Sequence, residues 1–407
     1  MKKIIIPIII IAIGVFVGCK WQTWFGNPEE PQYEPLSAPG RVMLTFGDDS
    51  ALSRNINWQA SDKLQEAFVE LKDDSASSLT VDSTSSPTDT IQANGEVFES
   101  RGGKAAYYTA KLRNLKPGTT YQYRVWTGGK CTPWYTFNTY NKDENHYAFM
   151  YVGDVQDTNS KRVNKTLLSA LRAHQGVEFC VFGGDLVERP IDYHWQEVYD
   201  GLDTIRQSYP VMTVTGNHDY LKSVICTLEK RFQLIFSYFL DSQVGVNQVY
   251  TLKYNDMQLF FLDSNREFFY LFSQRAWLKE QMSKSKARWK IVVLHHPLHS
   301  VKGRMNNLIQ RWMFKSLIEE EGVDIVLQGH EHSYARKTVK NDNDRTTAYV
   351  ISHCSGKNYI PKNEDDFDIF STQGRYYQVI SVAGDTLRLS AYDADSGLLF
   401  DKIEKTK

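Results

Sequence analysis

Residues 179–189, FCVFGGDLVER, join an apolar run to a polar cluster that begins with Gly184-Asp185. A short apolar run that ends at glycine is typical of a buried strand, since glycine lets the backbone turn sharply. Four further apolar runs are also followed by polar clusters. These are Gly153-Asp154-Val155-Gln156, Gly216-Asn217-His218-Asp219, His295-His296 and Gly329-His330-Glu331-His332. Because the carboxyl ends of strands in open α/β sheets are where sites form, we expect these side chains to share one site.

Apolar runs of strand length recur through the second half of the chain, at 148–152, 179–182, 211–214, 259–262, 291–294 and 325–327. Between them lie longer segments with apolar residues at helical spacing, at 163–174, 275–284 and 305–321. Two alternating segments near the end, 376–382 and 387–392, predict a closing pair of strands. Strands that alternate with helices indicate an α/β layered domain, which we expect over residues 146–405.

Residues 37–140 have a β-like pattern instead. The large apolar residues Val42, Leu44 and Phe46 alternate with Met43 and Thr45, a two-residue period that is typical of strands. Residues 108–125 contain two more alternating segments on either side of the turn Leu115-Lys-Pro-Gly-Thr-Thr-Tyr121. We therefore expect an all-β domain over residues 37–140.

An apolar run over residues 4–17 follows two lysines at the start of the chain. A helix of this run is about 21 Å long, short of a bilayer core of about 30 Å, so the run predicts an export signal. Cys19, directly after it, resembles the cleavage box of bacterial lipoproteins. The resemblance implies removal of residues 1–18, lipidation of Cys19 and an exported protein anchored at the periplasmic or cell-surface side of a bacterial membrane. The proline-containing residues 19–36 would be a tether.

The composition excludes some classes of protein. The 407 residues include 47 Lys and Arg and 48 Asp and Glu, which gives a net charge of −1. A chain without excess positive charge is no general nucleic-acid binder, so we expect no nucleic-acid partner beyond nucleotides as substrates. Aromatic residues make up 13 %, too many for a chain that is disordered over most of its length.

The five polar blocks, in this order and spacing, resemble those of the calcineurin-like metallophosphoesterases. The turn that ends at Tyr121 resembles the corner of a fibronectin type III domain. Together the two features resemble most the purple acid phosphatase branch. The resemblance implies an N-terminal all-β, fibronectin III-like sandwich, followed by an α/β layered metallophosphoesterase domain in which a β-sheet sandwich is flanked by helices.

The resemblance also implies a centre for two divalent metal ions, Mn, Fe or Zn. The first ion would be held by Asp154, Gln156, Asp185 and His332, and the second by Asn217, His295 and His330, with Asp185 as the bridge. These residue types suit the task, because two neighbouring cations need a shared anion and mixed oxygen and nitrogen donors.

Two residues depart from the purple pattern. Glu188 stands where that branch has the tyrosine that binds ferric iron, so we expect a colourless protein. Gln156 stands where that branch has glycine and the wider superfamily has histidine. Its amide oxygen is a harder donor than imidazole.

Glu188-Arg189 is similar to a block of the serine/threonine phosphatases, in which the acid orients a histidine and the arginine contacts phosphate. By this resemblance Glu188 would accept a hydrogen bond from His218, and Arg189 would bind the phosphate. Two other interpretations of Glu188 stay open, a direct metal ligand and a surface acid.

The implied activity is hydrolysis of phosphoric monoesters, as in acid phosphatases, with a metal-bridging hydroxide as the nucleophile. His218, Glu188 and Arg189 would be catalytic, and Asn217, His296 and His299 would bind the phosphorylated substrate. Tyr334 and Arg336 would form the rim of the cleft or support the fold.

Two alternatives to a monoesterase stay open. One is a phosphodiesterase or nucleotide-processing hydrolase at the same site. The other is an anchored glycan-binding protein with little activity, which would use the N-terminal sandwich.

Overall fold

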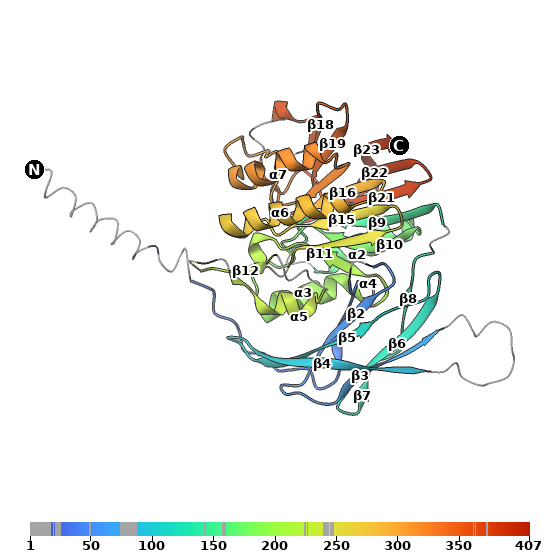
Figure 1. Ribbon diagram of the computed structural model, residues 1–407. Coiled ribbons are helices and arrows are strands. Elements are labelled where there is room, and N and C mark those ends of the chain that lie inside the picture. The colour runs from blue at the N-terminus through green and yellow to red at the C-terminus, as the bar shows by residue number, and fades with distance from the viewer. Residues whose placement is uncertain are drawn as a thin grey trace, which may run out of the picture.

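The computed structural model describes residues 18, 20, 26–48, 50–73, 88–141, 144–156, 160–223, 225, 227–238, 244, 248–360, 362, 364–371 and 373–407 (Figure 1). The apolar run 4–17 and Cys19, on which the predicted export and lipidation depend, lie outside these residues. Within them, every helix is too short or too polar to cross a bilayer.

Eight strands form the N-terminal domain: β1 (Gly40–Thr45), β2 (Arg54–Ala60), β3 (Ala67–Asp73), β4 (Asp89–Glu99), β5 (Lys104–Leu112), β6 (Thr120–Thr127), β7 (Lys130–Cys131) and β8 (Tyr135–Asn138). They pair in the order β1-β2-β5-β4-β3-β6-β7, with β8 on the other part of β6. The first part of β4 pairs with β3 and the rest with β5, so this long strand joins the two layers of the domain. The predicted all-β fold is confirmed.

The core of this domain contains residues of both layers, among them Trp58, Tyr108 and Tyr123. The hydroxyl of Tyr121 accepts a hydrogen bond from the backbone N–H of Lys116 at 3.0 Å. A bond from this tyrosine to the chain a few residues upstream is the corner contact that the sequence predicts.

The second domain is built around two sheets. The six-stranded sheet has the order β11 (Val211–Thr213), β10 (Val177–Phe182), β9 (His146–Val152), β21 (Tyr376–Ala383), β22 (Thr386–Asp393), β23 (Leu399–Thr406). The seven-stranded sheet has the order β14 (Tyr250–Tyr254), β15 (Met257–Phe261), β16 (Trp289–Val293), β17 (Ile325–Gln328), β19 (Thr346–Ile351), β18 (Tyr334–Lys340), β20 (Ile369–Ser371). A short hairpin, β12 (Tyr220–Leu221) and β13 (Thr227–Leu228), lies apart from both.

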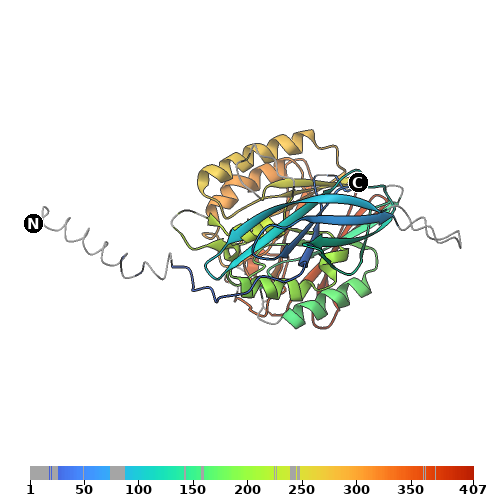
Figure 2. The same cartoon turned by 90° about the horizontal axis from the view of Figure 1, so that it is seen from below.

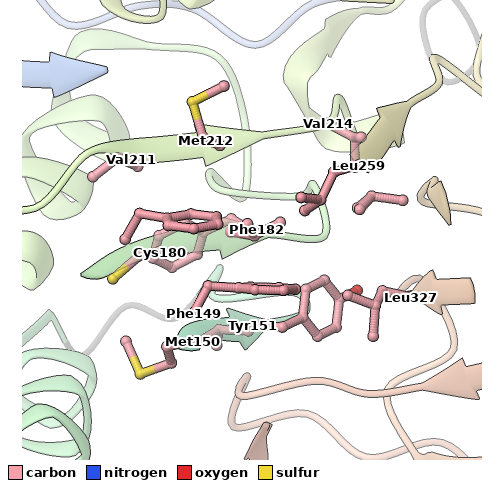
Figure 3. Close-up of a cluster of buried hydrophobic side chains, with 14 of the residues drawn as sticks. Phe149, Met150, Tyr151, Cys180, Phe182, Val211, Met212, Val214, Leu259 and Leu327 are labelled. Carbon is pink, nitrogen blue, oxygen red and sulfur yellow. The ribbon is translucent and has the colours of Figure 1, made fainter. Parts of the chain in front are cut away.

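The helices of this domain are α2 (Ser160–Ala173), α3 (Asp192–Leu202), α4 (Ile205–Ser208), α5 (Lys230–Ile235), α6 (Phe268–Lys284) and α7 (Leu308–Glu320), with the short turns η2 (Asn217–Asp219) and η4 (Glu364–Asp366). The two sheets share one apolar core, in which Phe149 and Phe182 of one meet Leu259 and Leu327 of the other (Figure 3). A second core joins the outer face of the seven-stranded sheet to α6 and α7. The predicted sheet sandwich with flanking helices is confirmed.

The two domains pack directly against each other. Phe46 of the first domain meets the rings of Phe179 and Tyr254 at centroid distances of 5.4 and 6.0 Å. The guanidinium of Arg41 lies 2.6 Å from a carboxylate oxygen of Asp192 at the start of α3. These contacts hold the β-domain against the second domain, which lies directly behind it in the view from below (Figure 2).

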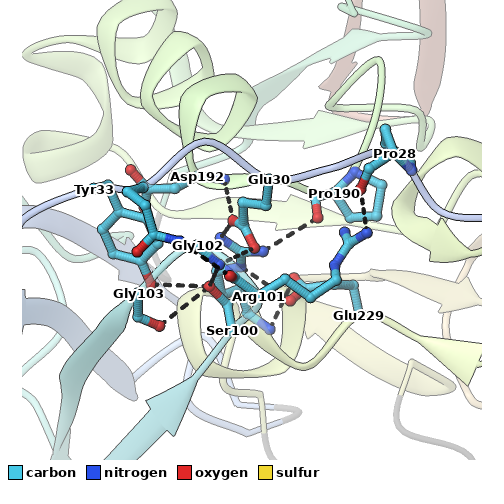
Figure 4. Close-up of polar contacts among 12 residues, drawn as sticks. Pro28, Glu30, Tyr33, Ser100, Arg101, Gly102, Gly103, Pro190, Asp192 and Glu229 are labelled. Atoms are coloured by element: carbon cyan, nitrogen blue, oxygen red, sulfur yellow. Dashed lines mark hydrogen bonds and ion pairs between the residues drawn. The ribbon is translucent and has the colours of Figure 1, made fainter.

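The segment predicted to be a tether was expected to hold the folded body away from its anchor. Its described part instead packs on that body. Oε1 of Glu30 lies 2.6 Å from Arg231 and accepts a hydrogen bond from the backbone N–H of Asp192 at 2.8 Å (Figure 4). Its Oε2 accepts another from the N–H of Gly102, in the β4–β5 turn. Glu30 and Arg231 are both buried. The ion pair therefore holds this segment against both domains.

Candidate metal centre

The five polar blocks lie at the carboxyl ends of five strands. In the six-stranded sheet β9, β10 and β11 run parallel, and Asp154, Asp185 and Asn217 follow them. In the seven-stranded sheet β16 and β17 run parallel, and His295 and His330 follow them. Since the two sheets face each other, the two rows of loops meet at one edge of the sandwich.

The predicted ligands form two overlapping groups. Potential ligand atoms of Asp185, His295 and His330 lie within 4.8 Å of one another, and so do those of Asp154, Asp185 and His332. Asp185 belongs to both groups, as a bridging carboxylate would. His330 and His332, two residues apart, are divided between the groups.

Asn217 lies with the second group. Its Oδ1 is 2.8 Å from Nδ1 of His330 and 3.3 Å from Nε2 of His295. The amide oxygen therefore points toward the same place as the two imidazoles.

The backbone at the centre leaves no room for larger side chains. A Cβ atom on Gly216 would lie 2.0 Å from Oδ1 and 2.1 Å from the backbone nitrogen of Asp185.

Four of the predicted ligands, Asp154, Asp185, His330 and His332, have positive φ angles, between 31° and 70°. Non-glycine residues adopt this region at an energetic cost, and such residues concentrate at functional sites.

Hydrogen bonds fix the orientation of the imidazoles. Nδ1 of His295 lies 2.8 Å from the carbonyl oxygen of Gly183, and Nδ1 of His332 lies 3.2 Å from that of Lys357. A carbonyl only accepts, so in both rings Nδ1 carries the proton and Nε2 keeps its lone pair for a metal. Such outer contacts are typical of metal-binding histidines.

The ionisable side chains of the centre shift one another's pKa values. Burial raises the pKa of Asp154 well above its ordinary value. Burial also opposes ionisation of Asp185, but His295 outweighs it and holds the pKa of Asp185 below its ordinary value. In turn, despite burial, Asp185 and Asp154 raise the pKa of His295 to about 9. The pocket thus favours positive charge, which a cation can supply.

Buried polar atoms without hydrogen-bond partners also indicate that the site suits metal ions. Oδ1 of Asp154 and both amide atoms of Gln156 are buried without a hydrogen-bond partner among the described residues. Unsatisfied buried polar atoms are costly, and a bound cation would satisfy the two oxygens. With carboxylate, amide and imidazole donors around one point, the residues fit a pair of divalent ions.

Glu188 holds His218, but not in the predicted way. Nδ1 of His218 lies 2.7 Å from the backbone carbonyl oxygen of Glu188, so the side chain is not its hydrogen-bond partner. The Glu188 carboxylate instead lies 2.6 Å from Nζ of Lys357. The backbone carbonyl oxygen is within hydrogen-bond distance of the His218 ring, while the carboxylate is held by Lys357. Arg189 is exposed.

The two other histidines predicted to bind substrate differ in position. The ring of His296 lies 4.4 Å from that of His330, and its Nδ1 is 2.9 Å from Oγ of Ser264. His299 packs instead on Tyr349, at 4.7 Å between ring centroids. His296 therefore borders the centre, whereas the described contacts of His299 are with other parts of the fold.

Tyr334 and Arg336 support the fold. The hydroxyl of Tyr334 donates to the Asp401 carboxylate at 2.9 Å, and Arg336 binds the same carboxylate at 2.7 Å. Of the two roles left open for them, the structure shows the structural one.

Several residues at the centre were assigned no role from the sequence. The buried carboxylate of Asp219 accepts hydrogen bonds from the backbone N–H groups of Gly216 and Asp185, at 2.7 and 3.1 Å. His353 and Tyr359, which follow β19, lie 5.5 and 4.5 Å from the ring of His332. Asp219 stands in one of the predicted blocks, and His353 follows an apolar strand, which is the signal that identified those blocks.

Comparison with protein families gives two matches that adjoin along the chain. Residues 39–139 match the model of the purple acid phosphatase N-terminal domain. Residues 137–334 match that of the calcineurin-like phosphoesterases. The second match contains all the predicted metal ligands.

Curated relatives of this chain are named purple acid phosphatases. Purple acid phosphatase 17 of Arabidopsis thaliana is 23 % identical over 191 residues, which are 40 % of this chain and 51 % of the relative. Purple acid phosphatase 5 of the same plant is 23 % identical over 318 residues, 74 % of this chain and 71 % of the relative. The chain thus spans about half the length of purple acid phosphatase 17 and 71 % of the length of purple acid phosphatase 5.

Among solved structures, the fold is similar to that of purple acid phosphatase PPD1 from yellow lupin (Lupinus luteus) seeds. The TM-score is 0.74 at 16 % sequence identity, with 91 % of this chain and 74 % of that chain covered. This likeness extends over both domains.

Proposed function

Because the chain carries a calcineurin-like phosphoesterase domain behind a purple acid phosphatase N-terminal domain, we propose that it hydrolyses phosphoric monoesters with two divalent metal ions. One observation carries the proposal: Asp185 belongs to two groups of potential ligands, each completed by residues from other loops. A shared carboxylate between two such groups is the arrangement that two-metal hydrolysis requires.

Seven residues would hold the ions. Asp154, Gln156, Asp185 and His332 would take the first, and Asp185, Asn217, His295 and His330 the second. When bound, a pair of divalent ions acidifies water for attack and neutralises charge on the phosphate oxygens. Without the tyrosine of the purple branch, Mn, Fe(II) or Zn is the expected metal.

In the proposed reaction, His218 transfers a proton. The carbonyl of Glu188 fixes its Nδ1 as the protonated atom, which leaves Nε2 to exchange a proton with the leaving oxygen. His218 is half-buried, so the ring is held by its neighbours yet accessible from solution.

In the proposed reaction, Asn217 binds the phosphate. Its Oδ1 is directed at His295 and His330, so its N–H groups are left to donate to a phosphate oxygen. The Asn217 residue is exposed, as a substrate-binding group must be.

Positive side chains near the centre favour a monoester, which carries more negative charge than a diester. Nζ of Lys302 lies 4.5 Å from the ring centroid of Tyr359, which in turn packs on His332. Arg189 is exposed on the loop that carries Asp185.

The test compares hydrolysis of p-nitrophenyl phosphate and bis-p-nitrophenyl phosphate by the purified chain, with and without a chelator. We expect faster turnover of the monoester, lost with chelator and restored by Mn or Zn. Faster turnover of the diester would instead establish a phosphodiesterase. No metal-dependent turnover of either would reject the enzymatic proposal.

A further inference from the structure

A group of exposed apolar side chains, here called the apolar face, lies at the starts of α6 and α7 and in the loop just before α7. It consists of Phe268, Phe269, Phe272, Met305, Leu308, Ile309 and Trp312. Phe269 is 81 % exposed, Met305 79 % and Trp312 68 %. The ring of Phe268 is stacked on Trp312 at 5.8 Å, so the two helices contribute to one continuous surface. Contiguous exposed apolar surface marks an interaction site.

The apolar face lies beside the metal centre. The side chain of Gln310, which follows Ile309 of the face, donates to the backbone carbonyl of Ser264 at 3.0 Å. The hydroxyl of Ser264 contacts His296, whose ring lies 4.4 Å from the ligand His330. Since α6 follows β15 and α7 follows β16, both helices begin at the edge of the sheet where the ligands gather.

The N-terminal segment reaches the body at the same edge. The side chain of Asn27 exchanges two hydrogen bonds with the backbone of Lys222, at 2.9 and 2.8 Å, just after β12. β12 directly follows His218 and Asp219. In Figure 1 the described N-terminal segment begins beside β12, on the side where α6 and α7 begin. Residues 19–27 span at most about 30 Å when extended.

This distance limits where a membrane can be. If the apolar run 4–17 or a lipid on Cys19 is in a bilayer, the bilayer surface lies within that reach of Asn27. The edge of the molecule that carries both the metal centre and the apolar face is therefore the one nearest the lipid.

The charges around the apolar face suit an anionic lipid surface. Lys302 and Arg304 precede Met305, and Arg311 precedes Trp312. Arg304 is exposed, and Lys302 and Arg311 are half-buried. Aromatic side chains with basic neighbours are typical of surfaces that insert shallowly into headgroups.

We propose that the apolar face docks on the bilayer, so that the metal centre opens toward the membrane surface. The occupant is lipid, and the contact is a second attachment besides the N-terminal anchor. This inference is independent of the proposed hydrolytic activity and goes beyond it.

The test uses the full chain in vesicles of phosphatidylglycerol and phosphatidylethanolamine. A polarity-sensitive fluorophore is attached at Phe269→Cys in a Cys131→Ser background, since Cys131 is an exposed free thiol. The matched control carries the label at Ala383→Cys. Ala383 is exposed and pairs with His146, at the opposite end of β9 from the metal centre. The background protein without an added cysteine is subtracted.

We expect nitroxide-labelled lipids to quench most of the emission at position 269 and little at position 383. A further variant, with Phe272→Asp and Ile309→Asp, should lose the quenching at 269 and keep its turnover of p-nitrophenyl phosphate. Equal quenching at both positions, or none at 269, would overturn the proposal. Protection of the label by a second copy of the chain, without lipid quenching, would overturn it too.

Discussion

Nδ1 of His218 lies 2.7 Å from the backbone carbonyl oxygen of Glu188, while the Glu188 carboxylate is paired with Lys357. The group that orients His218 is therefore one that every amino acid possesses. Any residue that keeps the backbone of this loop can hold the imidazole.

Glu188→Gln should consequently leave kcat close to the wild-type value, because it removes no contact of His218. His218→Ala should lower kcat by about 100-fold or more, the usual contribution of a proton-transfer group. Steady-state rates with p-nitrophenyl phosphate check both. A loss in Glu188→Gln as large as that in His218→Ala would mean that the carboxylate acts in catalysis.

Asp185→Asn should release both metals, because the bridging carboxylate loses its charge and each ligand group loses a member. The measurement is metal content by elemental analysis after gel filtration, with turnover recorded on the same sample. Asp200→Asn is the matched control, since Asp200 is exposed on α3. Full metal content in Asp185→Asn would contradict the shared-ligand arrangement.

Gly216→Ala should destabilise the fold and impair metal binding together. The added Cβ would overlap the Asp185 backbone nitrogen as well as its carboxylate, and backbone cannot move aside cheaply. We expect a loss of at least about 2 kcal/mol in urea unfolding. Gly176→Ala is the control, because there the added atom would meet only the His146 ring, at 3.3 Å.

Glu30→Gln should destabilise the protein at pH 7 by about 3 kcal/mol, as expected when a buried ion pair loses a partner. Burial opposes ionisation of Glu30, but its hydrogen bond and attraction to Arg231 prevail and lower its pKa. Its ionised form therefore contributes stability above the ordinary pKa of 4.5, and the contribution is lost as the pH falls through the lower folded value.

Urea unfolding of the Glu30→Gln variant and the wild type between pH 7 and pH 3 measures this effect. The difference in unfolding free energy should shrink below pH 4.5, the ordinary pKa of glutamate. A difference that is constant with pH would show that the Glu30 charge is unimportant.

The purified protein should be colourless, because Glu188 replaces the tyrosine that gives the purple branch its colour. An absorption spectrum of protein with its native metals checks this. An intense visible band would contradict it, and loss of that band in Tyr359→Phe would assign the colour to Tyr359, which packs on His332.

The sequence predicted the strand ends well, and for a physical reason. Parallel strands bring their carboxyl ends to one edge, so polar blocks after apolar runs are sufficient to place Asp154, Asp185 and His295 together. The division of His330 and His332 between two ligand groups came from the family resemblance.

Contacts between distant residues could not be predicted in this way. Nothing near Glu30 in the sequence indicates Arg231 as its partner, so the docked segment had the composition of a spacer. Likewise, residue type alone does not show whether Glu188 acts through its side chain or its backbone. The start of α6 was missed because the aromatic run 268–272 obscures the helical spacing.

The ion pair between Glu30 and Arg231 also constrains the order of assembly. The two residues are separated by 201 positions, so at 5–20 residues per second Glu30 is made roughly 10–40 s before its partner. During that time its carboxylate lacks the charged partner, because the N–H groups of Gly102 and Asp192 that also bind it carry no charge. The ion pair that holds the N-terminal segment therefore forms late, after the central part of the second domain has been synthesised.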